Sequence, residues 1–206
     1  MIEVLQPAVN KRLTTLETVK EELHITDTTN DSLLEKLIDQ ASAMIVRYCR
    51  RPFALEKYRE TLAGYGGPRI MLTMRPVVEI FSVKERGYEI TGYKLESPES
   101  GILYRAQGWG WNPSLVWNIT WHPLANTEGY IYEVEYTAGY KLPGDPDRNL
   151  PEDIERACIN TVVSWYQGMQ YAGSIKSESI GDYSVTYAEP LKVDVTDLLE
   201  GWRAVI

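Results

Sequence analysis

Residues 30–52, NDSLLEKLIDQASAMIVRYCRRP, carry the strongest helical pattern in the chain. Apolar side chains recur there every three or four residues, which places them on one face of a helix. The members of this face are Leu33, Leu34, Leu37, Ile38, Ala41, Met44, Ile45 and Tyr48. Arg47, Arg50 and Arg51 suit the negative end of the helix dipole, and Pro52 ends the helix. The pattern predicts a helix roughly 30 Å long, with one face that needs a partner.

Other helical patterns supply that partner. A long helix is predicted after Pro151, because a proline and two acidic residues suit a first turn. Its apolar face comprises Ile154, Ala157, Cys158, Thr161, Val162, Trp165, Tyr166 and Met169. A short helix is predicted from Thr14, with Thr14 and Glu17 as a capping box, and a last one from Thr196. Because such faces must be buried, the helices on both sides of the middle region should pack together.

Residues 53–141 form a middle region of different character. They show the period-two alternation of antiparallel strands, with glycine and proline between the runs. The clearest runs are 70–74, 115–122 and 130–137, and residues 81–90 predict a hairpin that turns near Gly87. About six strands are expected, enough for a small sandwich or barrel.

The predicted fold class is therefore α+β. A small helical bundle domain, residues 1–52 and 142–206, is interrupted by an inserted antiparallel β domain, residues 53–141. Residues 1–13 are expected to be a short lead into the first helix.

The composition limits the classes of function. The 206-residue chain has a formal net charge of −8 at pH 7, which argues against a general nucleic-acid binder, because such a protein needs cations to neutralise phosphates. Cys49 and Cys158 lie in apolar helical patterns, so we expect buried free thiols in a reducing compartment. The sequence contains no apolar run that predicts a signal peptide or a membrane span.

No pattern predicts catalysis, a metal or a cofactor. Neither His24 nor His122 accompanies a nucleophile motif. The glycines at 64–67 precede a strand pattern, whereas a phosphate cradle requires a helix. Acidic residues between 145 and 153 have calcium-like spacing but lack the glycine and distal glutamate of an EF-hand. We expect a protein that is not an enzyme.

Tryptophans in the middle region leave one alternative open. Trp109, Trp111, Trp117 and Trp121 could stack sugars, which suggests a carbohydrate-binding or hydrolytic β domain; hydrolysis would need two facing carboxylates. A turn whose aromatic residues pack on the sheet is the other interpretation, because Trp and Tyr are good strand formers.

Several segments, taken in order, resemble the head-tail connector (adaptor) proteins of tailed bacteriophages. They are residues 16–25 and 31–41 in the first two helices, 134–140 at a strand end, 150–154 with Ala157, and 177–187, which contains Gly-Asp-Tyr. They cover roughly half of the chain and flank the β region. The role of the β region is not implied by the resemblance.

The resemblance implies a structural virion protein without enzymatic activity or cofactors. It implies a homo-oligomeric ring, twelvefold by analogy, which binds the portal protein at the head-tail junction and extends the DNA channel. The ring would be a docking platform for a tail-terminator, stopper or tail-tube (nozzle) protein. Genomic DNA would pass without sequence-specific binding, no membrane would be involved, and assembly would take place in the host cytoplasm. A neck or tail-completion protein one layer below remains an alternative.

Two regions are candidates for contacts, the first by its position in the resemblance and the second by its own sequence pattern. Residues 193–206 correspond to a portal-contacting segment, in which an apolar stripe should dock on the third helix or on the portal. The candidates there are Leu198, Leu199, Trp202, Arg203 and Ile206. Residues 173–187 have the composition of an ordered connection followed by a short strand. Its candidates for subunit contacts are Glu178, Gly181, Asp182, Tyr183 and Tyr187.

Overall fold

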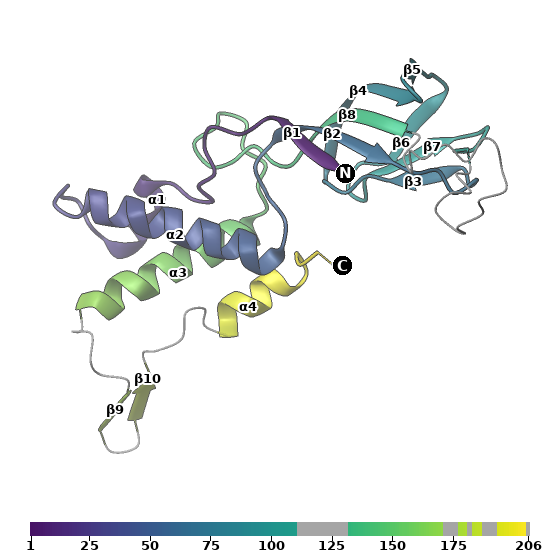
Figure 1. Ribbon diagram of the computed structural model, residues 1–206. Helices are drawn as coiled ribbons and strands as arrows, with labels where there is room; N and C mark the ends of the chain where they lie inside the picture. The colour runs from purple at the N-terminus through teal and green to yellow at the C-terminus, as the bar shows by residue number, and fades with distance from the viewer. Residues whose placement is uncertain (111–131, 171–176, 181–182, 187–192, 205–206) are drawn as a thin grey trace. The chain divides into compact units, whose positions relative to one another are not determined.

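The computed structural model describes residues 1–110, 132–170, 177–180, 183–186 and 193–204 (Figure 1). The chain forms two compact units, each of which buries apolar side chains. A helical unit comprises Asn10–Phe53 and Lys141–Ile206, and a β unit comprises Met1–Val9 and Ala54–Tyr140. The predicted α+β fold class is confirmed.

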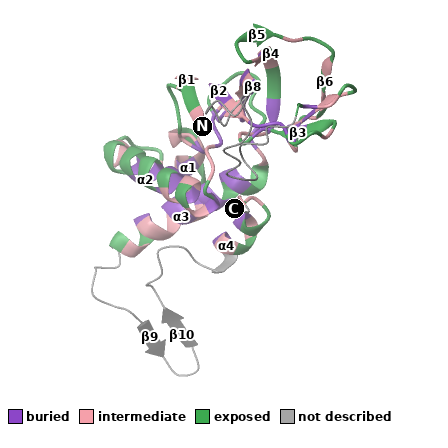
Figure 2. Ribbon diagram, turned by 45° about the vertical axis from the view of Figure 1, so that its right-hand side comes forward, coloured by how far each residue is buried: buried purple, intermediate pink, exposed green. Residues whose placement is uncertain are grey.

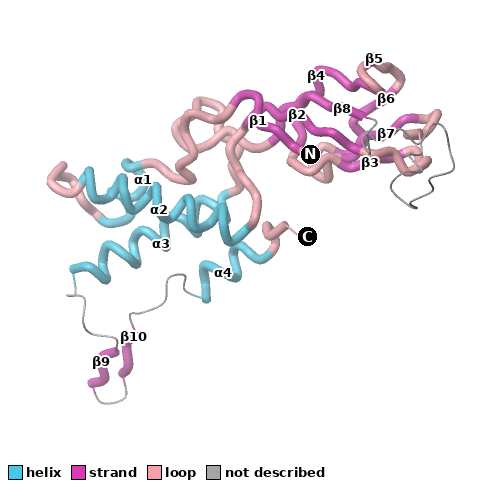
Figure 3. Tube along the Cα trace, in the orientation of Figure 1, coloured by secondary structure: helices cyan, strands magenta, loops and turns pink. Residues whose placement is uncertain are grey.

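The described part of the helical unit contains helices that pack across the chain's interruption (Figure 3). They are α1 (Leu16–Leu23), α2 (Asp31–Cys49), α3 (Glu152–Gln170) and α4 (Val193–Glu200). Helix α2 packs on α3, α1 contacts both, and α4 contacts α3 and α2. The helices before and after the β insertion therefore bury their faces against each other, as their patterns predict.

Buried residues of the helical unit follow the predicted faces (Figure 2), except that Leu33 and Met169, which were expected on those faces, are exposed. The fully or almost fully buried members on α2, α3 and α4 are Leu34, Leu37, Ile38, Ala41, Ile45, Cys49, Ile154, Ala157, Cys158, Val162, Val195 and Leu199. Both cysteines are free and buried. Burial raises the pKa of the Cys49 thiol to about 11 and that of Cys158 to about 12. Because the reactive form is the thiolate, neither cysteine is reactive near neutral pH.

The start of α1 differs from the prediction by one residue. Thr15, rather than Thr14, is the N-cap, and its hydroxyl accepts a 3.2 Å hydrogen bond from the Thr18 amide. Thr14 is buried and donates to Glu155 Oε1 of α3 at 3.4 Å. The tertiary contact with α3 therefore uses the hydroxyl that the local pattern assigned to the cap.

In the β unit the described strands form two open antiparallel sheets (Figure 1). The strands are β1 (Ile2–Gln6), β2 (Glu56–Leu62), β3 (Arg69–Met71), β4 (Val77–Glu85), β5 (Tyr88–Glu89), β6 (Tyr93–Ser97), β7 (Ile102–Arg105) and β8 (Tyr132–Ala138). One sheet has the order β1-β2-β8-β4-β5 and the other β3-β7-β6. One core takes side chains from both sheets, so the described strands form an open sandwich and not a closed barrel.

The N-terminal segment corrects the predicted domain boundaries. Residues 1–9, expected to lead into the helices, belong to the β unit, where β1 pairs antiparallel with β2. The Ala8 amide donates to the buried Glu56 carboxylate at 3.0 Å, which fixes the end of this segment. A five-residue strand is too short to show a clear sequence pattern. Its partner β2 lies some fifty residues away in the chain, so local sequence does not reveal the pairing.

Two local predictions for the β unit are confirmed. Strand β8 alternates as expected, with Tyr132, Val134 and Tyr136 buried in the core. The hairpin β4–β5 turns through Arg86 and Gly87, both with positive φ, as a two-residue turn of the hairpin type requires. The strand predicted at 115–122 lies outside the described residues.

Buried tyrosines of the β unit pair with buried carboxylates. Tyr136 donates to Glu60 at 2.6 Å, and Glu60 also accepts hydrogen bonds from the amide and hydroxyl of Thr73. Tyr58 donates to Glu56 at 2.8 Å. Burial raises the pKa of both tyrosines, so both phenols stay protonated donors. The two glutamates are therefore satisfied structural acceptors.

Candidate interaction surfaces

Part of the C-terminal segment is buried in the helical core. Leu199, expected at a portal contact, is fully buried, and with Val195 it packs α4 within the chain's own helices. Leu198 and Trp202 are half-buried, Arg203 is exposed, and Ile206 lies outside the described residues. The Ala204 amide donates to the Cys49 carbonyl at 2.9 Å, which ties the segment to the end of α2.

Arginines gather at this end of α2 and form a surface that we call the basic corner: Arg47, Arg50, Arg51 and Arg203. The Arg203 guanidinium lies 5.2 Å from the ring centroid of Tyr48 and pairs with Glu200 at 3.1 Å. Arg51 lies 5.4 Å from the ring of Phe53. Arg47 and Arg50 are exposed, and neither pairs with a carboxylate in the described part of the chain. The corner thus adds positive charge to an acidic protein.

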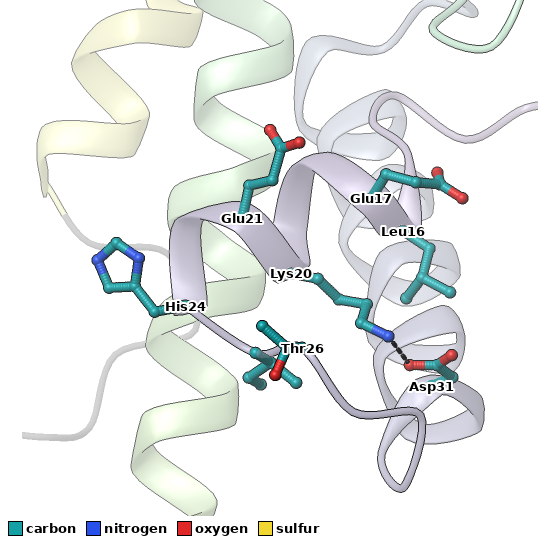
Figure 4. A pocket seen from close by; sticks show the side chains of 8 residues that line it. Leu16, Glu17, Lys20, Glu21, His24, Thr26 and Asp31 are labelled. Carbon is teal, nitrogen blue, oxygen red and sulfur yellow. Dashed lines mark hydrogen bonds and ion pairs between the residues drawn. The ribbon is translucent and has the colours of Figure 1, made fainter.

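An open groove of about 520 Å³ lies near the other end of α2 (Figure 4). This acidic groove is lined by Leu16, Glu17, Lys20, Glu21, His24, Ile25, Thr26 and Asp31. Lys20 reaches across from α1 to Asp31 at 2.7 Å, as Figure 4 shows, and so neutralises one carboxylate. Glu17 and Glu21 are exposed, and neither pairs with a cation in the described residues. Being four residues apart, they share one face of α1.

The predicted subunit-contact segment contains a strand pair. Strand β9 (Ser177–Ile180) pairs antiparallel with β10 (Tyr183–Thr186), and the pair contacts no other described helix or strand. Glu178 lies in β9 and Tyr183 in β10, whereas Gly181, Asp182 and Tyr187 lie outside the described residues. The sequence indicated the second strand of this pair but missed the first, which is short and polar.

In the β unit, the tryptophan that could have stacked a ligand is buried. Trp109 is fully buried, donates from Nε1 to the Pro68 carbonyl at 3.1 Å, and meets the Tyr132 ring edge-on at 5.1 Å. The glycine loop before β3 bonds to it through the backbone, since the Trp109 amide donates to the Gly67 carbonyl at 2.8 Å. Trp109 is therefore a core residue; Trp111, Trp117 and Trp121 lie outside the described residues.

Two acidic residues with calcium-like spacing form ion pairs with nearby cations. In the acidic linker, Asp147 pairs with Lys141 and Glu152 with Arg148. His24 is exposed at the end of α1, and His122 lies outside the described residues. Within the described ranges, no cluster of three or more His, Cys, Asp or Glu side chains is arranged to hold a metal. Those ranges also contain no helix whose length and apolar character would suit a membrane crossing.

Comparison with known proteins gives matches that span both units. Residues 12–191 match the family described as HCP, head completion protein. A solved structure titled as the neck of an empty GTA particle computed with C6 symmetry has a TM-score of 0.59, and one of a native GTA particle neck computed with C12 symmetry has 0.58. A third, the virion of a native gene transfer agent (GTA) particle, has 0.55. Each shares 17% identity and covers 100% of this chain and 96% of the other. The curated proteins gave no sequence match.

Proposed function

Because the chain belongs to the head completion protein family, we propose that it is a structural component of the neck of a phage-like particle. The observation that carries this proposal is the extent of the family match, residues 12–191, which includes both the helices and the inserted β region. Membership also confirms the resemblance to phage head-tail connector and neck proteins. The titles of the similar structures, which name particle necks, support the same role.

The finer proposal is an adaptor ring directly below the portal protein. The similar necks were computed with sixfold and twelvefold symmetry, which supports a ring of many copies and, by analogy, twelve. Such a ring closes when each copy contacts the next through two different patches. The ring would extend the DNA channel and be the platform for a tail-terminator, stopper or tail-tube protein.

Within that arrangement, the two contact regions keep separate roles. The strand pair β9–β10 contacts no other described element, and an isolated pair of strands is marginal in water, so it is suited to pack on a neighbouring copy. Leu198, Trp202 and Arg203 are the accessible part of the C-terminal segment, and Leu198 on α4 would face the portal. Leu199 is not part of that surface, because it is buried.

A second candidate is a completion protein one layer below the adaptor. It is favoured by the family's description, which names head completion, and it would share the ring but lack portal contact. In either layer, the net charge of −8 supports a channel wall that DNA passes without sticking.

An electron-microscopy reconstruction of particles that carry this chain tests the proposal. We expect a ring of this chain at the neck, with α4 against the portal and carboxylates toward the lumen. A ring separated from the portal by another protein would select the completion layer. Particles in which the chain lies outside the neck would refute the neck role itself.

A further inference from the structure

We propose that neighbouring copies join through the two ends of α2, with the basic corner of one copy seated in the acidic groove of the next; this rests on the proposed ring. The two surfaces belong to the same helical unit, and one 19-residue helix separates them. At 1.5 Å per residue, that helix holds them about 28 Å apart. Two surfaces so far apart cannot meet within one copy.

The charges of the two surfaces are complementary. The basic corner presents four guanidinium groups, of which Arg203 is partly neutralised by Glu200. The acidic groove presents three carboxylates, of which Asp31 is neutralised by Lys20. Arg47 and Arg50 on one side, and Glu17 and Glu21 on the other, remain without ionic partners in the described part of the chain.

Helix dipoles alone do not account for this arrangement. Acidic residues near the start of a helix and basic residues near its end are each stabilised by the dipole, which explains Asp31 and Arg47. Arg203 comes from the segment after α4 and stacks on Tyr48 of α2, so a second element adds charge to the corner. Glu17 suits the dipole of α1, because it lies in the first turn, but Glu21 lies one turn later and is not explained in this way.

The residue types of the two surfaces also suit a head-to-tail contact. The corner includes the Tyr48 ring that Arg203 covers, and the half-buried Trp202 directly precedes Arg203 in the chain. The groove is open and has apolar walls in Leu16 and Ile25. Arginine and aromatic side chains are enriched at interface centres, and the carboxylates of the groove would supply the complementary charge. Because the two patches differ, successive contacts generate a ring and not an isolated dimer.

Cysteine cross-linking in assembled particles tests the contact directly. The test variant is the full chain with both Arg47→Cys and Glu17→Cys. Arg50 and Glu21 are unchanged, so one opposite-charge pair remains available to the contact. A disulfide requires Cα atoms within about 7 Å, so these two positions can bond only between copies. The native Cys49 and Cys158 are buried and add no exposed thiol. We expect a ladder of covalent oligomers under oxidation. The control pairs Glu17→Cys with Lys36→Cys, an exposed position in the second turn of α2 and far from the basic corner, and should remain monomeric.

Charge reversal provides the second measurement. Arg47→Glu with Arg50→Glu, or Glu17→Lys with Glu21→Lys, should reduce incorporation into necks about tenfold or more, because each places like charges together. The chain with all four changes restores opposite charges and should recover incorporation. Lys36→Glu and Glu99→Lys, at exposed positions outside both surfaces, are the matched controls.

The outcomes separate this inference from the proposed function. A neck ring that yields no cross-link, and whose charge-reversed variants behave like the controls, overturns the α2-end contact and leaves the neck role standing. Charge-reversed corner variants that assemble normally but fail to retain DNA would assign the arginines to phosphate contact, which also overturns it. Particles without a ring of this chain overturn both.

Discussion

Glu155 is a buried carboxylate on α3 whose environment is set by three side chains. It lies 2.7 Å from Arg148 Nη1 and accepts a hydrogen bond from Thr14, while Glu152 lies close enough to repel it. Burial is the largest influence and raises the pKa of Glu155 despite the attraction of Arg148. The folded state therefore binds the Glu155 proton more tightly than the unfolded state does.

This raised pKa fixes the sign of a pH dependence. The stability that Glu155 contributes is full below its ordinary value of 4.5 and is lost as pH rises through the raised pKa. Relative to Glu155→Gln, the wild-type free energy of unfolding should fall as the pH rises above about 4.5, as measured by urea titration at a series of pH values. The exposed Glu99→Gln variant controls for the loss of one charge. If the difference in unfolding free energy between wild type and Glu99→Gln changed with pH in the same way, the effect could not be assigned to Glu155.

At the scale of elements, α4 is part of the helical core as well as a candidate partner contact. Leu199 has no exposed surface and Val195 is buried, while Leu198 on the same helix is half-buried. Removal of α4 would therefore expose apolar surface on α2 and α3. A truncated chain that fails to assemble would not by itself locate a portal contact, so single substitutions are needed.

Leu199→Ala should lower the free energy of unfolding of the helical unit by about 2–5 kcal/mol, because it leaves a cavity in a packed core. Leu198→Ala should cost less stability but reduce incorporation into necks if this side chain faces the portal. Denaturant titration followed by far-ultraviolet circular dichroism measures the first effect, and particle composition measures the second. Equal destabilisation by the two variants would show that Leu198 is packed in the core as Leu199 is.

The elements differ in how far sequence predicts them, and the cause is the range of the interactions involved. Helices α2 and α3 were predicted because every turn repeats the apolar face. The position of the α1 cap was wrong by one residue, since the hydroxyl of Thr14 is held by Glu155, more than a hundred residues away. Strand β1 was missed because only its pairing with β2 makes it a strand.

The candidate surfaces show the same limit. From the sequence, Trp109 and Leu199 were both candidates for surface contacts. The tertiary structure shows that both side chains are buried. The basic corner could be predicted only in part, because Arg47, Arg50 and Arg51 are adjacent in sequence, whereas Arg203 joins them through its contact with Tyr48. Surfaces assembled from distant segments require the fold.

For the whole molecule, the interruption of one unit by the other is the main feature of organisation. The chain begins in the β unit, passes through α1 and α2, returns to complete the sheets, and ends in α3 and α4. The family match and the similar neck structures extend over both units, so the combination is shared and is not a peculiarity of this chain.

The pairing of β1 with β2 has a consequence for the protein as it leaves the ribosome. Synthesis is vectorial, so β1 emerges first and waits while both early helices are made before β2 appears. The β unit then has every strand once Tyr140 has emerged, whereas α1 and α2 still lack α3. We expect that, in nascent chains arrested just beyond this point, the β unit resists protease whereas α1 and α2 are cleaved. Equal cleavage of both units would show that neither folds before the chain is released.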